Sequence, residues 1–103
     1  MIVTPLEIIS NAMTALPEEM NSREAIVIML AIGLQESRFQ HRRQLVGNPP
    51  KPIGPAKGFW QFERLGGCKG VVAHPASRYW MAKVCEHRGV EFTATAIWNA
   101  IEF

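Results

Sequence analysis

The sequence predicts one mainly helical α+β domain over residues 1–103, because three observations agree. The length suffices for a single small domain and not for two. Helix-start residues followed by apolar residues at helical spacing occur in the first and last thirds of the chain, and a segment rich in proline and glycine separates them. Apolar residues make up 48% and charged residues 19%, a balance typical of a folded domain rather than a disordered chain.

The first helix is predicted to begin after Thr4 and to end before Pro17. Thr4 can cap the helix, Pro5 suits its first position, and Glu7 stands where it can complete a capping box. Helical spacing places four apolar residues on one face, namely Leu6, Ile9, Met13 and Leu16. This face should pack on the core.

A second helix is predicted to start at Asn21, with Glu24 three residues later, and to end near Phe39. Residues 25–34 are apolar on nearly all sides of this helix. A helix that is apolar all round is normally buried. We therefore expect it to be the central helix of the domain.

Residues 40–58 should form a long loop with one short hairpin, because four prolines and three glycines in 47–58 exclude a helix there. A third helix is predicted from Pro75 to about Arg88. Thr93 can cap a last helix, which lacks a stop signal before the chain ends. We expect that C-terminal helices of the fold are missing.

Charge is distributed unevenly along the chain. Residues 1–36 carry a net charge of −4, residues 37–78 carry +7, and residues 79–103 carry −1. The basic middle segment indicates either an anionic partner or simply a solvated basic face. All nine acidic residues are glutamate, which excludes a Ser-His-Asp triad and an EF-hand loop.

The cysteine and histidine residues do not have the spacing of a metal site, so we expect no metal and no cofactor. Cys68 and Cys85 are the only cysteines, and without a signal peptide they are expected to be free thiols, although pairing stays open. No apolar run approaches the roughly 20 residues that a membrane helix needs. We therefore expect no membrane partner.

Glu36 is the candidate catalytic residue. It lies in the last turn of the most apolar helix, so burial and the negative end of the helix dipole should both favour its protonated form. A glutamate held protonated near neutral pH can act as a general acid. Gly33, one turn earlier, should open access to it. Alternatively, Glu36 is a surface residue paired with Arg42 or Arg43.

The segment Phe59-Trp60-Gln61-Phe62 is the candidate binding site. Aromatic faces stack on sugar rings, and an amide can orient hydroxyl or acetamido groups. The simpler alternative is that the aromatic residues belong to the core, which leaves Gln61 unexplained.

Two segments resemble motifs of one family. Residues 36–39, Glu-Ser-Arg-Phe, are similar to the E-S-x-F motif of soluble lytic transglycosylases and goose-type lysozyme-like domains. Residues 54–61 resemble the G-x-x-G-[LF]-[MW]-Q segment of that family, and the two motifs occur in the family's order. The resemblance covers about residues 25–62. It implies a lysozyme-like fold and cleavage of the β-1,4 bond between N-acetylmuramic acid and N-acetylglucosamine in peptidoglycan, by a phage or prophage protein made in the cytoplasm and acting at the cell wall.

The resemblance also implies roles for single residues. Glu36 would be the acid and base of a transglycosylase that releases 1,6-anhydro sugars, and Gln61 would line the cleft with Phe59 or Trp60. Ser37 would hydrogen-bond the substrate or the glutamate. The family's later A-Y-N-A-G motif has only a loose counterpart at residues 96–100, where tryptophan replaces tyrosine.

Three alternatives remain open. Glu63 is the only other carboxylate near the aromatic segment, and a working pair with Glu36 would make the protein a lysozyme-type hydrolase. A protein that binds nucleic acid or another anionic polymer would suit the basic segment, but the basic residues are scattered through loops, so no nucleic acid is expected. A non-enzymatic phage adaptor with a degenerate lysozyme-like fold is the third.

Overall fold

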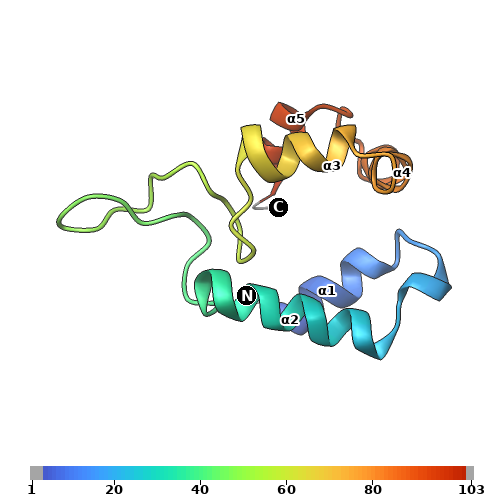
Figure 1. Ribbon diagram of the computed structural model, residues 1–103, viewed down its shortest axis with the longest axis horizontal. Helices are drawn as coiled ribbons and strands as arrows, with labels where there is room; N and C mark the ends of the chain where they lie inside the picture. The colour runs from blue at the N-terminus through green and yellow to red at the C-terminus, as the bar shows by residue number, and fades with distance from the viewer. Residues whose placement is uncertain (1–3, 102–103) are drawn as a thin grey trace.

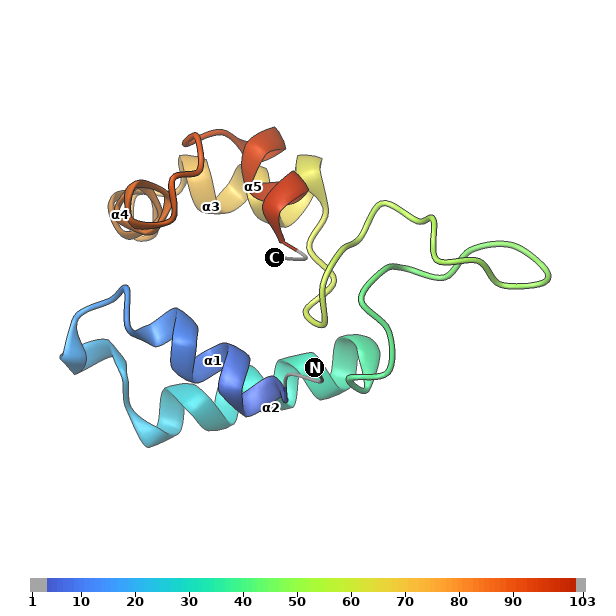
Figure 2. The ribbon, with the colours of Figure 1, turned by 180° about the vertical axis from the view of Figure 1, so that it is seen from behind.

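The computed structural model describes residues 4–101, which form two helical layers joined by a long loop (Figures 1 and 2). One layer holds α1 (Pro5–Met13), the short 3-10 turn η1 (Glu18–Met20) and α2 (Arg23–Ser37). The other holds the π-helical turn η2 (Arg64–Cys68), α3 (Lys69–Ala73), α4 (Arg78–Arg88) and α5 (Ala94–Ala100). The closest helix contacts lie within each layer, between α1 and α2 and among η2, α3, α4 and α5. The predicted mainly helical character is confirmed.

Helix α1 begins as its sequence predicts. The Thr4 amide donates to the Glu7 carboxylate at 2.9 Å, and the Glu7 amide donates back to the Thr4 hydroxyl at 3.2 Å, so the capping box is complete. The helix ends at Met13, before Pro17. Ile9 and Met13 are buried.

Helix α2 differs from its prediction in its cap and in its burial. The cap is Ser22, whose hydroxyl accepts from the Ala25 amide at 3.1 Å, and not Asn21. The prediction of a fully buried central helix is wrong, because the apolar residues of the outer face are more than half exposed: Val27 55%, Ile28 58% and Leu34 56%. Helix α2 lies in an outer layer, where α1 and the loop cover only part of its circumference (Figure 1).

No helix occurs between residues 38 and 63, which confirms the predicted helix-free loop at residues 40–58. Its two arms meet through single antiparallel bridges, Arg43 with Lys57 and Val46 with Lys51, and a third bridge joins Lys57 to Phe62. The expected hairpin is therefore present as isolated bridges, and within residues 4–101 no longer strand occurs. The far end of this loop projects away from both layers (Figure 2).

The C-terminal layer contains one segment that the sequence did not predict. Residues 64–73 form η2 and α3, and three glycines, Gly66, Gly67 and Gly70, lie within these two short elements. The next helix, α4, begins at Arg78 and not at Pro75. Its predicted end is confirmed, since Gly89 adopts a left-handed conformation with φ of 67°. Thr93 caps α5 through a bond from the Ala96 amide.

Among the described residues few apolar side chains are buried, and two of these are cysteines. The set comprises Ile9, Met13, Ala56, Cys68 and Cys85. Both cysteines are free thiols, as expected, and burial raises the pKa of each. In the part of the chain that the structure describes, no helix is long and apolar enough to cross a membrane.

The two candidate caps of α2 give a direct test of its start. Ser22→Ala removes the acceptor of the Ala25 amide and should lower the free energy of unfolding by about 1 kcal/mol. Asn21→Ala, the matched control, should change it by less than about 0.5 kcal/mol. Urea unfolding of the two variants measures both values, and a larger loss for Asn21→Ala would contradict the observed cap.

The buried thiols predict slow alkylation. Because their pKa values are raised in the folded state, folding favours the protonated form. This contribution to stability is present below the unfolded thiol pKa of about 8.5 and is lost as the pH rises through the higher folded values. Iodoacetamide should modify Cys68 and Cys85 at least about tenfold faster in urea than in the native protein. Mass spectrometry measures the two rates. Equal rates in urea and in the native protein would show that the thiols are accessible to solvent in the folded state.

Candidate functional site

The two motifs of the resemblance lie against each other, and Ser37 joins them. Its hydroxyl donates to the Phe59 carbonyl at 2.6 Å and accepts from the Phe39 amide at 3.1 Å. Ser37 is itself buried. These bonds fix the turn at residues 58–61 on the C-terminal end of α2, and the predicted hydrogen bond from Ser37 to substrate or to Glu36 stays a prediction.

Three aromatic rings surround this contact. Phe39 meets Phe59 and Trp60 edge to face, with ring centroids 5.7 and 5.8 Å apart. The Trp60 indole donates to the Met29 carbonyl of α2 at 2.7 Å. Phe59 and Trp60 thus attach the loop to α2, in agreement with the core alternative, and they also line the groove described below.

Gly33 makes room for these rings. A Cβ atom added there would come within 2.6 Å of the Phe39 ring and 3.1 Å of the Trp60 ring. The expectation that Gly33 opens access to Glu36 is wrong, because the space beside Gly33 is filled by the Phe39 and Trp60 rings. The Phe39 ring reaches this space because Arg38 and Phe39 turn the chain back over the helix end, with φ values of 53° and 56°.

Gln61 closes its own turn. Its side-chain amide donates to the Gly58 carbonyl at 2.9 Å, and its φ of 53° folds the chain back toward that residue. Gln61 is half-buried and does not belong to the lining of the apolar groove described below, and its predicted role in the substrate cleft stays a prediction.

Glu36 lies on the surface of the last turn of α2. The expected burial is wrong, because Glu36 is exposed and even Ile32, one turn earlier, is 47% exposed. Helical spacing places Glu36 on the same face as Met29 and Ile32, both of which line the groove. The carboxylate therefore continues the row of α2 side chains that border the groove.

The alternative ion pairs of Glu36 are also not seen. Arg42 holds its guanidinium 4.7 Å from the centroid of the Phe59 ring. The Arg43 side chain donates to the Gly54 carbonyl and lies 5.3 Å from the centroid of the Trp98 ring. Glu63, the possible second carboxylate, is exposed at the start of η2 and does not line the groove.

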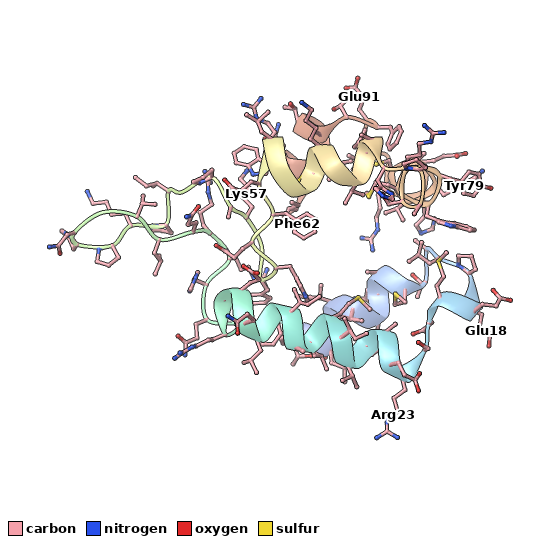
Figure 3. All side chains as sticks on the ribbon, in the orientation of Figure 1. Glu18, Arg23, Lys57, Phe62, Tyr79 and Glu91 are labelled. Carbon is pink, nitrogen blue, oxygen red and sulfur yellow. The ribbon has the colours of Figure 1, made fainter. Side chains whose placement is uncertain are left out.

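An apolar groove of about 460 Å³ runs between the two layers. Both layers and the loop contribute to it, and Figure 3 shows Lys57 and Phe62 where the loop enters. Its lining consists of Ile8, Ile9, Ala12, Met29, Ile32, Arg42, Lys57, Gly58, Phe59, Trp60, Phe62, Cys68, Val71, Met81, Ile97 and Ile101. Within residues 4–101, no three His, Cys or Glu side chains gather so as to hold a metal ion.

Two glycines test the close contact between α2 and the loop. Alanine normally favours a helix over glycine by about 1 kcal/mol. Gly33→Ala should nevertheless destabilise the protein by about 1–3 kcal/mol, since its Cβ would overlap the Phe39 ring. Gly70→Ala in α3, where an added Cβ meets nothing within 4 Å, should be neutral or stabilising. Thermal unfolding compares them, and a stabilising Gly33→Ala would contradict the contact.

Comparison of the chain with protein-family models, curated proteins and solved structures finds no match.

Proposed function

We propose that the protein is a peptidoglycan lytic transglycosylase in which Glu36 serves as acid and then as base. The observation that carries this proposal is the 2.6 Å hydrogen bond from Ser37 to the Phe59 carbonyl. It brings together the two segments that resemble the family's motifs, although 22 residues separate the two partners in sequence. A lysozyme-like fold forms part of the same proposal.

The position of Glu36 suits an acid that must reach a polymer. A glycan strand is too long to enter a closed pocket, so its cleaving group has to stand at an open surface. Glu36 is exposed, yet it is held on a regular helix whose next residue, Ser37, is anchored to the loop. A bound strand would cover Glu36 and exclude water from it.

The reaction requires one carboxyl group. Protonated Glu36 gives its proton to the glycosidic oxygen, and the bond from this oxygen to C1 of N-acetylmuramic acid breaks. The resulting carboxylate then takes the proton of the C6 hydroxyl as that oxygen attacks C1. The products are a 1,6-anhydro sugar and a free C4 hydroxyl on the neighbouring sugar, and no water is consumed.

The surroundings of Glu36 support a single-carboxylate reaction over a pair. Hydrolysis by two carboxyl groups needs them about 5–10 Å apart across the scissile bond. Glu63 stands at the start of η2 in the other layer, outside the groove lining, whereas Glu36 continues the α2 row that borders this groove. The cations Arg42 and Lys57 near the groove suit a strand that carries lactyl and peptide carboxylates.

Glutamine substitutions test the assignment. Glu36→Gln should reduce the release of muropeptides from purified peptidoglycan at least about 100-fold, because it removes the transferable proton. Its thermal stability should be unchanged, since the side chain is exposed. Glu63→Gln, the matched control, should retain activity within about tenfold.

Mass spectrometry of the digest identifies the reaction. Anhydro-muropeptides that disappear with Glu36→Gln are the expected result. Free reducing ends, lost equally with Glu36→Gln and Glu63→Gln, would identify a two-carboxylate hydrolase instead. Residual activity of Glu36→Gln within about tenfold of the unmodified protein would exclude Glu36 as the acid.

A further inference from the structure

One face of α2 is exposed along the whole length of the helix. Helical spacing places the Cα atoms of seven residues within about 60° of Ala31 around the helix axis. All seven are exposed, and we call them the outer stripe: Glu24, Val27, Ile28, Ala31, Leu34, Gln35 and Arg38. Gly33 and Ser37, which are buried, lie on the other side of the helix. Figure 3 shows Arg23, next to the outer stripe at the start of α2, pointing away from the C-terminal layer.

The middle of the outer stripe is apolar, and its two ends carry opposite charges. Val27, Ile28 and Leu34 are 55%, 58% and 56% exposed. A single exposed leucine is ordinary in a folded protein, but three large aliphatic side chains on successive turns of one helix form a continuous patch, which is typical of an interaction site. Glu24 lies in the first turn of α2, and Arg38 is the residue that caps its C-terminal end.

The outer stripe is also symmetric about Ala31. Glu24 and Arg38 stand seven positions before and seven positions after it, and Ile28 and Leu34 stand three positions before and three after. If a two-fold axis passes through Ala31, Glu24 of each chain meets Arg38 of the other, and Ile28 of each meets Leu34 of the other. A parallel pair of helices would instead bring like charges together at both ends.

We propose that two copies of this chain associate through the outer stripe, with their α2 helices antiparallel and crossing at Ala31. The small side chain of Ala31 allows the two helices to approach closely at the axis. The antiparallel arrangement also places each negative helix end beside a positive one. A membrane surface fits the outer stripe less well, because helices that lie on membranes carry several lysines or arginines, whereas this stripe pairs one cation with one carboxylate.

The size of the contact sets its expected strength. Glu24 and Arg38 are about 21 Å apart along the helix axis. A single pair of helices of this length is small beside the about 1,200–2,000 Å² that stable complexes bury. We therefore expect a reversible dimer with a dissociation constant of about 10–100 μM, not a permanent one.

This association goes beyond the cleavage of peptidoglycan and does not depend on it. Glu36 lies about 140° from Ala31 around the helix axis, so the second copy would leave it exposed. Glu36→Gln should leave the association unchanged, and loss of activity and loss of the dimer are separate outcomes.

Sedimentation equilibrium of the full chain between about 5 and 500 μM tests the dimer. The mean mass should rise with concentration from the 11.5 kDa of one chain toward twice that value. A mass that stays at one chain throughout would overturn the proposal. So would binding of the monomer to phosphatidylcholine vesicles that Ala31→Glu abolishes, because a membrane surface would then cover the outer stripe.

Matched variants locate the contact. Ala31→Glu brings two like charges together at the two-fold axis and should weaken the association at least about tenfold. Leu65→Glu, the control, changes an apolar residue of η2 that is 72% exposed and lies outside the outer stripe, so it should leave the association unchanged. Both positions are exposed, so both variants should fold. Equal weakening by the two variants would contradict the contact.

Charge reversal tests the antiparallel orientation. Glu24→Arg or Arg38→Glu alone would place like charges at both ends of the contact, and each should weaken the association about threefold or more. The combined variant restores opposite charges at both ends and should recover the original affinity to within about twofold. If the combined variant is as weak as the two single variants, the two chains do not pair in this orientation.

Discussion

The attachment of one loop turn to the end of α2 determines how the rest of the molecule is arranged. The Ser37 hydroxyl donates to the Phe59 carbonyl of this turn, and the Trp60 indole donates to the Met29 carbonyl of α2. On the opposite side, the Trp98 indole of α5 donates to the Pro55 carbonyl at 2.8 Å. Since the closest helix contacts lie within each layer, the loop is the main connection between the layers, and these three bonds set their spacing.

This arrangement explains why the groove exists. The aromatic rings near Phe39 attach the loop to the end of α2, whereas the apolar faces of the two layers farther along leave a groove open between them. Protein interiors are normally close-packed, so apolar walls left apart are unfavourable unless something covers them. The same loop also contributes Arg42, Lys57 and Phe62 to the lining of this groove.

The sequence predicted several features that depend on residues three or four positions apart, although the cap of α2 and the start of α4 differ from their predictions. The capping box at Thr4, the stop at Gly89 and the cap at Thr93 are all confirmed, because each is decided by its own short segment. The burial of residues 25–34 was predicted wrongly. The apolar composition of a helix does not determine how many other segments pack against it, and α2 is covered on only part of its circumference. The reason for Gly33 could not be found either, because it depends on Trp60, 27 positions away in the sequence.

The order of residues at the end of α2 has a consequence for the candidate acid. Successive residues of a helix point about 100° apart, so the residue that anchors the loop also fixes the direction of its neighbour. Ser37 is buried against Phe59, and Glu36 is consequently directed to the face of Met29 and Ile32. The left-handed conformation of Arg38 ends the helix immediately afterwards. The Cα–Cβ direction of Glu36 is thus set by a buried neighbour, and under the proposed function this face of α2 is the one that would meet the glycan strand.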